Sequence, residues 1–432
     1  MKLTGTGLSC AHVAELAGGA ARVTIGPTDR ARAAWVTARE LTGPVYGRST
    51  GVGANKDVEV SGSGLDLLRS HAGGAGALIE AERARGMLAV RLNQLLAGGS
   101  GIDPGVLPVL ADVIGSGATP PVRAYGAVGT GDLTALATTA LCLLGEVAWR
   151  DGHDGLRYPL AGSDALPFIS SGALTLSDAA LALHRVRTLL EAAITVAARS
   201  FAAVDASAEP LAAAVHEARP HPGQALVAER LRGMLTRERA ARVQDPYGYR
   251  AFPQVHGAAL DALGHAERVV ETDLNAAAEN PLISGTLAWH NGNFHAAPLA
   301  LALDALRAAL VQTAQLSAAR LATLVNPAYT GRLPFLADRE GGSGVMILEY
   351  VAQDALAELR HLAAPVTTGT SVISLGTEDH ASFATQAARY ALRCVEPLEI
   401  VLACELVAAR HSPCPDRPLD TDLAAARAEL SR

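Results

Sequence analysis

The chain has 432 residues and a formal net charge of −7 at pH 7, with no block of like charges. A nucleic-acid-binding protein usually carries a basic face, so this balance argues against nucleic acid as a partner and favours a small-molecule ligand. Only 4% of the residues are aromatic, while alanine and leucine, both strong helix formers, dominate. The composition therefore predicts a helical protein that is long enough to bury a large core.

The five cysteines are scattered along the chain without CxxC spacing, which predicts neither a disulfide framework nor a zinc site. They are Cys10, Cys142, Cys394, Cys404 and Cys414. The histidines show no HxxxH or HExxH spacing, so we expect no metal site. The first residues lack the apolar core of a signal peptide, and no uncharged apolar run is long enough to span a membrane. We therefore expect a cytoplasmic protein with no membrane partner.

Residues 1 to about 60 have a mixed character and are rich in glycine and threonine. Apolar residues at helical spacing begin at Gly64 and continue to Ala97, and a second apolar stretch begins at Leu133. Asp132 and Glu146 flank this second stretch, which is too short for a membrane span. We expect it to form a buried helix.

The rest of the chain alternates long amphipathic runs with loops that contain glycine or proline. Helices are expected at about 174–240, 257–275, 296–325, 344–362 and 381–410, with a short polar helix in the tail. Pro246 and Pro253 predict a loop over 244–256, because proline interrupts a continuous helix. The pattern predicts an all-α protein: a bundle of long helices with a smaller, mixed N-terminal portion, divided as residues 1–170 and 171–432.

A glycine-rich loop at residues 45–53 contains Tyr46. A tyrosine in such a loop can act as a general base if nearby positive charge or helix dipoles lower its pKa. The alternative is an ordinary turn with an exposed tyrosine.

The proline-bounded segment 244–257 is unusually polar and contains Tyr247, Arg250 and Gln254. The planar guanidinium of Arg250 suits a carboxylate, and Tyr247 places a hydroxyl nearby. A structural loop held by hydrogen bonds is the alternative interpretation.

Three further motifs stand out. The asparagines of 275–281 and 291–295 are expected to tie loops together through backbone hydrogen bonds. Glu378, beside Asp379 and His380, can move protons or bind an amine, or else begin a helix. Residues 126–133 predict a tight turn into an apolar helix with Asp132 at its start, and the lysine of a phosphate-binding loop is missing.

The order of these motifs resembles histidine ammonia-lyase, and with it the histidine and aromatic amino-acid ammonia-lyase family, from end to end. The opening residues Leu3-Thr4 and Ala20-Ala21-Arg22-Val23 are similar to the family's start. Other matches pair 46–53 with YGVNTGFG, 70–73 with SHAAG, 244–257 with QDPYSLRCxPQVHG, 275–282 with NAATDNPL, 292–295 with GGNFHG, 333–336 with PPFL, 378–380 with QEDH and 416–419 with DRPL.

The resemblance implies an ammonia-lyase/fumarase-like helical bundle and a homotetramer whose active sites combine loops of three subunits. It implies that Tyr46 is the base and that Tyr247 and Arg250 support catalysis and hold the substrate carboxylate. His71 matches the position facing the substrate side chain, and Glu378 the one near the substrate amine. Ser170, Gln254 and Phe335 complete the expected substrate-binding set.

The chain departs from the family where the family builds its electrophile. The family motif GSVGASGDL forms a 4-methylideneimidazol-5-one from Ala-Ser-Gly. Here the turn is one residue shorter and reads Gly129-Thr130-Gly131 before Asp132. Threonine would give a more crowded electrophile, and the shorter turn would change the strain that drives ring closure. Ser170 also replaces the asparagine of the family's ALINGT segment, so we expect no methylideneimidazolone group and no other cofactor.

These observations favour a lyase-type enzyme without a built-in electrophile, using Tyr46 as base on an amino acid or an amino-acid-derived substrate. Elimination, conjugate addition and cyclisation would all fit, if the substrate brings its own activation. One alternative is a genuine histidine or aromatic amino-acid ammonia-lyase with a Thr130-derived electrophile. The other is an inactive paralogue that binds a ligand or partner. Composition suggests a bacterial source, for which specialised metabolism is a plausible setting.

Overall fold

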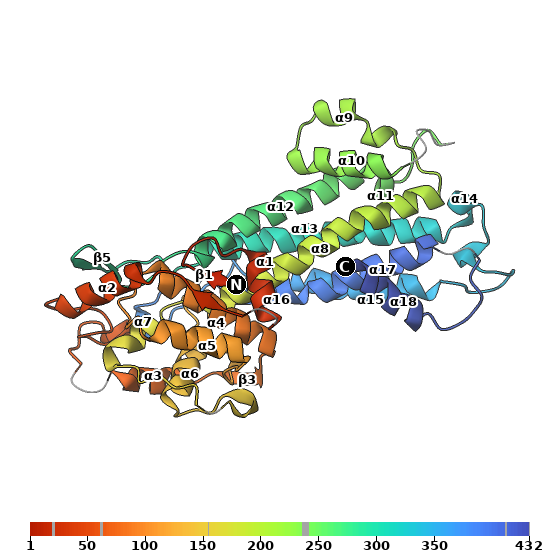
Figure 1. The fold of residues 1–432 in the computed structure, drawn as a ribbon. Helices are drawn as coiled ribbons and strands as arrows, with labels where there is room; N and C mark the ends of the chain where they lie inside the picture. The colour runs from red at the N-terminus through yellow and green to blue at the C-terminus, as the bar shows by residue number, and fades with distance from the viewer. Residues whose placement is uncertain (20–21, 61–63, 154, 236–241, 411–412, 432) are drawn as a thin grey trace. The chain divides into compact units, whose positions relative to one another are not determined.

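A computed structural model describes residues 1–19, 22–60, 64–153, 155–235, 242–410 and 413–431. Ala20 and Ala21 of the family-like opening, the end of the helical run predicted to 240 and the last residue of the tail lie outside the described residues. The chain forms two compact units that are discontinuous in sequence (Figure 1). The first comprises Met1–Leu181, Glu267–Leu301 and Pro365–Arg389, and the second Ala182–Ala266, Ala302–Ala364 and Tyr390–Arg432. This division differs from the predicted boundary at residue 170, because the ends of several long helices belong to the first unit.

The first unit contains most of the short elements. In chain order they are β1 (Lys2–Leu3), α1 (Cys10–Ala17), β2 (Thr24–Ile25), α2 (Asp29–Glu40), η1 (Gly53–Asn55), α3 (Leu65–His71), β3 (Ala75–Leu78), α4 (Ala81–Ala97), α5 (Val106–Ser116), β4 (Arg123–Tyr125), α6 (Leu133–Leu144) and α7 (Ala165–Ile169). The helix predicted over 64–97 is wrong as a single element. Gly73 and Gly74 interrupt it, and β3 then pairs antiparallel with β4. The buried helix expected from Leu133 is confirmed as α6.

The other two segments of the first unit, Glu267–Leu301 and Pro365–Arg389, come later in the chain. The end of α12 (Phe252–Leu274) leads to a hairpin of β5 (Leu282–Ser284) and β6 (Leu287–Trp289), in which Ile283 lies opposite Ala288. A loop carrying η6 (Ser374–Gly376) precedes α16 (Ala384–Arg393). The side chain of Asn275 exchanges two hydrogen bonds of 2.9 Å with the backbone of Leu8, which confirms the loop-tying role expected of the asparagines.

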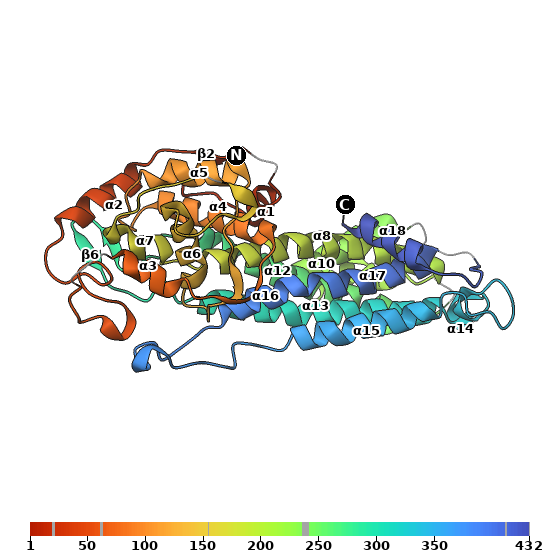
Figure 2. The same cartoon turned by 90° about the horizontal axis from the view of Figure 1, so that it is seen from below.

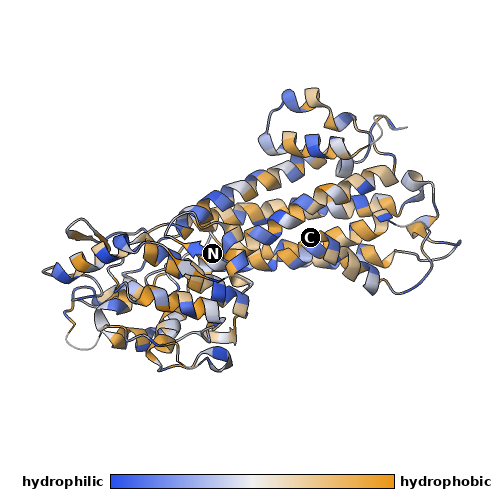
Figure 3. Ribbon diagram, viewed as in Figure 1, coloured by the Kyte–Doolittle hydropathy of each residue, from blue (hydrophilic) through white to orange (hydrophobic). Residues whose placement is uncertain are grey.

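The second unit is a bundle of long helices. It contains α8 (Ala173–Ala203) from Ala182 onward and most of α12 and α13 (Ala297–Leu324). Its other elements are η4 (Glu209–Leu211), α9 (Ala213–Glu217), α10 (Pro222–Met234), α11 (Tyr247–Arg250), α14 (Pro327–Thr330), η5 (Pro334–Leu336), α15 (Ile347–Leu362), α17 (Val395–Arg410) and α18 (Asp420–Leu430). Helices α15 and α17 lie side by side (Figures 1 and 2). Hydrophobic and hydrophilic residues interleave along each helix, as amphipathic helices require (Figure 3).

The helices expected at 296–325 and 344–362 are confirmed as α13 and α15. The run predicted over 174–240 divides into α8, α9 and α10, with prolines at 210, 220 and 222 at the breaks. The loop predicted over 244–256 is wrong from Tyr247 onward, because Pro253 occupies the first turn of α12, where its missing N–H is not needed. The helix predicted over 381–410 divides at Cys394 into α16 and α17.

Two helical segments are long and apolar enough to cross a membrane by length and composition alone, Gly162–Ala203 and Ala297–Leu324. Their apolar windows are 89% and 56% buried inside the protein. Core helices of soluble proteins have the same length and composition, so these two segments are only weak evidence for a membrane span.

The centre of the second unit holds a buried ion pair. Nε of Arg320 donates to Oε1 of Glu405 at 2.5 Å, and its terminal nitrogen donates to Oε2 at 2.8 Å. The hydroxyls of Ser200 and Ser317 also donate to this carboxylate, each at 2.6 Å. A second terminal nitrogen of Arg320 donates to the carbonyl of Gly248 at 3.0 Å. The pair therefore fixes the backbone between Tyr247 and Arg250.

Candidate active site

A cavity of about 660 Å³ in the first unit brings together five of the residues predicted from sequence. These residues come from segments far apart in the chain: Tyr46, His71, Thr130, Ser170 and Glu378. The cavity is within the size range of small-molecule sites. The polar lining therefore forms a candidate active site.

Tyr46 lies in the loop between α2 and η1, and its hydroxyl accepts a 2.8 Å hydrogen bond from the N–H of Gly53. The Tyr46 N–H donates to Nε2 of His290 at 3.2 Å. Gly47 has a φ of +65°, which favours glycine, and a Cβ there would lie 2.0 Å from a terminal methyl of Leu166, so any side chain would be strained and would displace Leu166. The loop thereby fixes the phenol at the cavity.

Burial raises the pKa of Tyr46, the Gly53 N–H opposes this effect, and the negative charge of Glu378 adds to it. The sequence made the role of Tyr46 as a general base conditional on a lowered pKa, and the described residues of one chain do not lower it. The physical reason is that desolvation outweighs the single N–H donor.

Glu378 is held close to the Tyr46 loop by a tight turn. Ser374 and Leu375 have φ values of +54° and +52°, which are uncommon outside glycine. The Ser374 hydroxyl accepts the N–H of Ala54 at 2.9 Å, and the N–H of Ile373 donates to the carbonyl of Glu378 at 2.9 Å. The turn therefore links Glu378 to the segment that binds the Tyr46 hydroxyl.

His71 is the last residue of α3. Its Nδ1 lies 2.9 Å from the carbonyl of Leu67, and a carbonyl can only accept, so Nδ1 carries a hydrogen. In the neutral ring, Nε2 then has a free lone pair. His71 can accordingly accept a hydrogen bond from a substrate group in the cavity.

Ser170 follows α7, whose C-terminal end is held by the buried guanidinium of Arg91. Arg91 donates to the carbonyls of Phe168, at 3.0 Å, and of Pro167. It also forms a buried ion pair of 2.9 Å with Glu279. The hydroxyls of Ser170 and Thr130 form no hydrogen bond within the described residues, so both are available to a ligand.

The Gly129-Thr130-Gly131 turn is held by the segment that begins α16. Gly129 has a φ of +94°, and a Cβ on it would lie 2.4 Å from the Ser382 hydroxyl and 2.6 Å from the Ala384 nitrogen. The Ser382 hydroxyl donates to the Gly129 carbonyl at 2.8 Å. The turn is therefore shaped for glycine and does not fit the alanine from which the family's ring begins.

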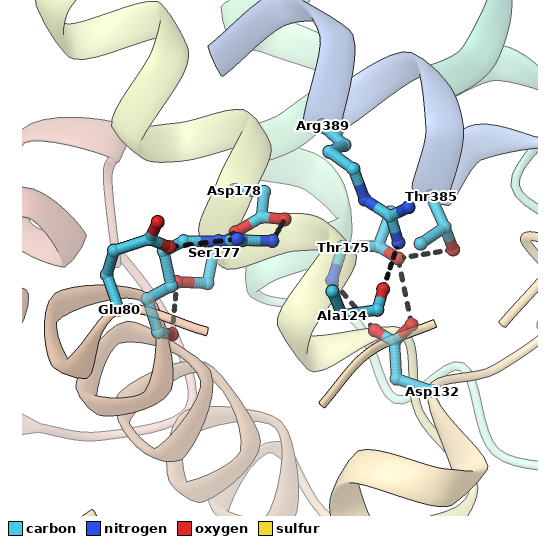
Figure 4. A network of polar contacts seen from close by, with 9 residues as sticks. Glu80, Ala124, Asp132, Thr175, Ser177, Asp178, Thr385 and Arg389 are labelled. Atoms are coloured by element: carbon cyan, nitrogen blue, oxygen red, sulfur yellow. Dashed lines mark hydrogen bonds and ion pairs between the residues drawn. The ribbon is translucent and has the colours of Figure 1, made fainter. Parts of the chain in front are cut away.

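Asp132 follows this turn and is 1% exposed. It stands at the N-cap position of α6, as expected, but its side chain does not cap that helix. Instead it accepts the N–H of Thr175 at 2.7 Å and its hydroxyl at 2.9 Å, in the first turn of α8 (Figure 4). The Thr175 and Thr385 hydroxyls lie 2.8 Å apart, which extends the network to α16. Burial raises the pKa of Asp132 to about 6, against hydrogen bonds from Thr175 and Leu174 that lower it.

Four further predicted residues belong to the second unit and do not line this cavity: Tyr247, Arg250, Gln254 and Phe335. The guanidinium carbon of Arg250 lies 4.3 Å from the centre of the Tyr247 ring. Nε of Arg250 and Oε1 of Gln254 are buried without a partner in the described chain. Phe335 lies separately in η5 with a φ of +59°. Unpaired buried polar atoms are costly, so Arg250 and Gln254 each have a hydrogen-bonding atom that a ligand or a further chain could satisfy.

Sequence reasoning missed several cavity residues. His290, Asn280 and Asn291 line the cavity together with Lys56. The Asn291 N–H donates to Oδ1 of Asn280 at 3.0 Å, and its side chain donates to the carbonyl of Glu279 at 2.9 Å. The asparagine motifs thus form the cavity wall as well as tying the loops. His290 directly precedes the second motif, and that position was the available signal.

Residues 8–413 match the profile of the aromatic amino acid lyase family. The chain belongs to the aromatic amino acid lyase family. It is 39% identical over 394 residues to the histidine ammonia-lyase of Geobacillus thermodenitrificans, covering 84% of this chain and 78% of the relative. It is 33% identical over 489 residues to the histidine ammonia-lyase of Streptomyces coelicolor, covering 98% and 95% of the two chains.

A solved tyrosine aminomutase from Streptomyces globisporus has the same fold as this lyase-family chain. The two structures agree with a TM-score of 0.91 at 27% identity, covering 100% of this chain and 97% of the other. The predicted family and the predicted long-helix bundle are therefore confirmed, and the protein is a lyase-family enzyme.

Proposed function

We propose that this lyase-family enzyme acts on an amino acid or an amino-acid-derived substrate without a methylideneimidazolone electrophile. The observation that carries the proposal is the turn at Gly129. This turn, which Ser382 and Ala384 hold, is one residue shorter than the family's motif, and Thr130 stands where the family has the serine that loses water.

In the proposed reaction, the phenolate of Tyr46 removes a proton from a carbon of the substrate. The released electron pair then forms a new double bond as a leaving group departs, attacks a conjugated acceptor, or closes a ring. Without an electrophile to activate an amine, the substrate must itself have an acidic proton, a good leaving group or an acceptor. A cationic group on the substrate would oppose the burial that raises the Tyr46 pKa, and Glu378 would bind that cation.

The carboxylate of the substrate would be bound by Arg250 beside Tyr247 and Gln254, with Phe335 close to the substrate. We propose that neighbouring copies in a homotetramer supply these residues, as the family resemblance implies. The unpaired Nε of Arg250 and Oε1 of Gln254 support this assignment, because a ligand or a neighbouring subunit would satisfy them. We further propose a cytoplasmic enzyme that binds neither nucleic acid nor membrane.

One observation favours a second candidate, an ammonia-lyase with a Thr130-derived electrophile. The Ser382 hydroxyl donates to the Gly129 carbonyl at 2.8 Å. Ring closure in the family proceeds by attack on the equivalent carbonyl, and a donor at its oxygen would polarise it.

Intact-mass measurement separates the two candidates, because ring formation removes two water molecules from the chain. We expect the mass calculated from the sequence, and a mass lower by two waters would overturn the proposal. Thr130→Ala provides the matched functional test, since alanine has no hydroxyl to eliminate. Turnover retained in Thr130→Ala but lost in Tyr46→Phe is expected. Loss in both variants would favour the Thr130-derived electrophile.

A further inference from the structure

A second cavity of about 520 Å³ lies against the first in the same unit. Ser170 and Phe294 line both cavities. Thr130 lines the first cavity, while its neighbours Gly129 and Gly131 line the second. The shortened turn is therefore a wall shared by the two cavities.

The second cavity contains one ionisable side chain without a partner among the described residues. Arg91 and Glu279 form an ion pair, and Nε2 of His295 lies 2.9 Å from Nδ1 of His380. The carboxylate of Asp273, by contrast, has neither an ion pair nor a hydrogen bond within the described chain. The lining therefore offers a net negative site that suits a cation.

The surroundings of Asp273 are themselves satisfied. Nε2 of Gln94 donates to the Asp273 carbonyl at 3.0 Å, and Oε1 of Gln94 accepts the Ser171 hydroxyl at 2.6 Å. Burial raises the pKa of Asp273, since no donor compensates its charge. A bound cation would offset the cost of burying the charged Asp273 carboxylate, so the second cavity should prefer a ligand with a cationic group.

The wall between the cavities has small side chains. Gly129 and Gly131 have none, and Ser170 stands where the family resemblance places an asparagine. The volume of each cavity falls within the range of roughly 300 to 1,000 Å³ that is typical of sites for drug-sized molecules. The two cavities together therefore have more room than one amino acid needs. A longer molecule can therefore use both cavities past Ser170.

We propose that the substrate is an elongated amino-acid derivative whose reacting end occupies the Tyr46 cavity and whose cationic end binds Asp273 in the second cavity. This inference rests on the proposed function, which it deepens by naming the substrate class. Recognition by Asp273 would separate this substrate from a free amino acid, which occupies the first cavity alone.

Two dipeptides that differ in one charge test the proposal: histidyl-lysine, and histidyl-norleucine, which lacks the terminal ammonium. Isothermal titration with the intact protein should give about tenfold tighter binding of histidyl-lysine, as expected for a charged hydrogen bond. Asp273→Asn should abolish that preference, while Asp112→Asn, an exposed acid on α5, should preserve it. Equal affinities, a preference that survives Asp273→Asn, or absence of binding by both dipeptides would overturn the proposal.

A blocking variant tests the second cavity independently of charge. Gly292 lines this cavity, and a Cβ there meets no atom within 4 Å. Gly292→Phe should weaken both dipeptides about tenfold or more and leave histidine binding unchanged. Gly115, on α5, is equally open, so Gly115→Phe is the matched control and should change neither. Unchanged dipeptide affinity in Gly292→Phe would overturn the proposal.

These measurements concern binding and need no turnover. Tyr46→Phe should keep the histidyl-lysine preference while losing activity. A preference retained together with a chain mass lower by two waters would reject the electrophile-free mechanism and keep the elongated substrate. Failure of the two proposals is therefore distinguishable.

Discussion

Nε2 of His295 lies 2.9 Å from Nδ1 of His380, and this hydrogen bond joins the loop after β6 to the loop that carries Glu378. One ring must donate and the other accept. Both rings belong to motifs that stood out in the sequence, the segments 292–295 and 378–380. The contact explains why two distant motifs end in histidine.

His380→Ala should therefore loosen the segment that carries Glu378. Loss of one partly exposed hydrogen bond should cost only about 1 kcal/mol of the free energy of unfolding. Amide hydrogen exchange should accelerate over residues 373–380, because that turn also contains the unfavourable φ angles of Ser374 and Leu375. His265→Ala, at an exposed site on α12, is the control. Unchanged exchange over 373–380 would show that the histidine pair does not restrain Glu378.

Asp132→Asn should remove a pH dependence of stability. The folded chain keeps the Asp132 proton up to about pH 6, whereas the ordinary value is 3.8. Between these values the folded state binds more protons, so this group's contribution to stability is full below about pH 4 and is lost as the pH rises through 6. Relative to Asp132→Asn, the wild type should lose roughly 2 to 3 kcal/mol between pH 4 and pH 7. Thermal unfolding across this range measures the difference, and a constant difference would contradict the prediction.

The helical architecture was predictable because apolar periodicity is a local property of the sequence. Helices α13 and α15 follow the predicted ranges closely. The short elements were not predictable in this way. β3 and β4 are only four and three residues long, and each forms by pairing with a partner about fifty residues away in the chain.

The candidate site was predictable only in part. The order of motifs identified Tyr46, His71, Ser170 and Glu378, which all line one cavity. The pKa direction of Tyr46 was not predictable, because desolvation depends on packing that a sequence does not display. The second cavity was missed for the same reason: Asp273 lies near the end of α12 without any local motif.

Glu405→Gln should strongly destabilise the second unit. Arg320 and Glu405 are both 0% exposed, and removing one charge leaves the other buried and unpaired, at a cost of about 3 to 5 kcal/mol. The double variant Arg320→Met with Glu405→Leu should lose less than Glu405→Gln alone, since no charge remains buried. Chemical denaturation measures both. Glu358→Gln is the matched control, because its pair with Arg393 is about half exposed and should contribute at most about 1 kcal/mol.

Gly129→Ala should destabilise the first unit even though it restores the family's alanine. The new Cβ would lie 2.4 Å from the Ser382 hydroxyl and 2.6 Å from the Ala384 backbone nitrogen, and the φ of +94° disfavours any side chain. Overpacking of this kind costs about 1 to 3 kcal/mol. Gly172→Ala, also at the second cavity, is the control, because its nearest contact would be 4.0 Å away at Asp132. Equal melting temperatures for the two variants would mean that the turn can rearrange to accept an alanine, and would contradict the prediction that its geometry requires glycine at position 129.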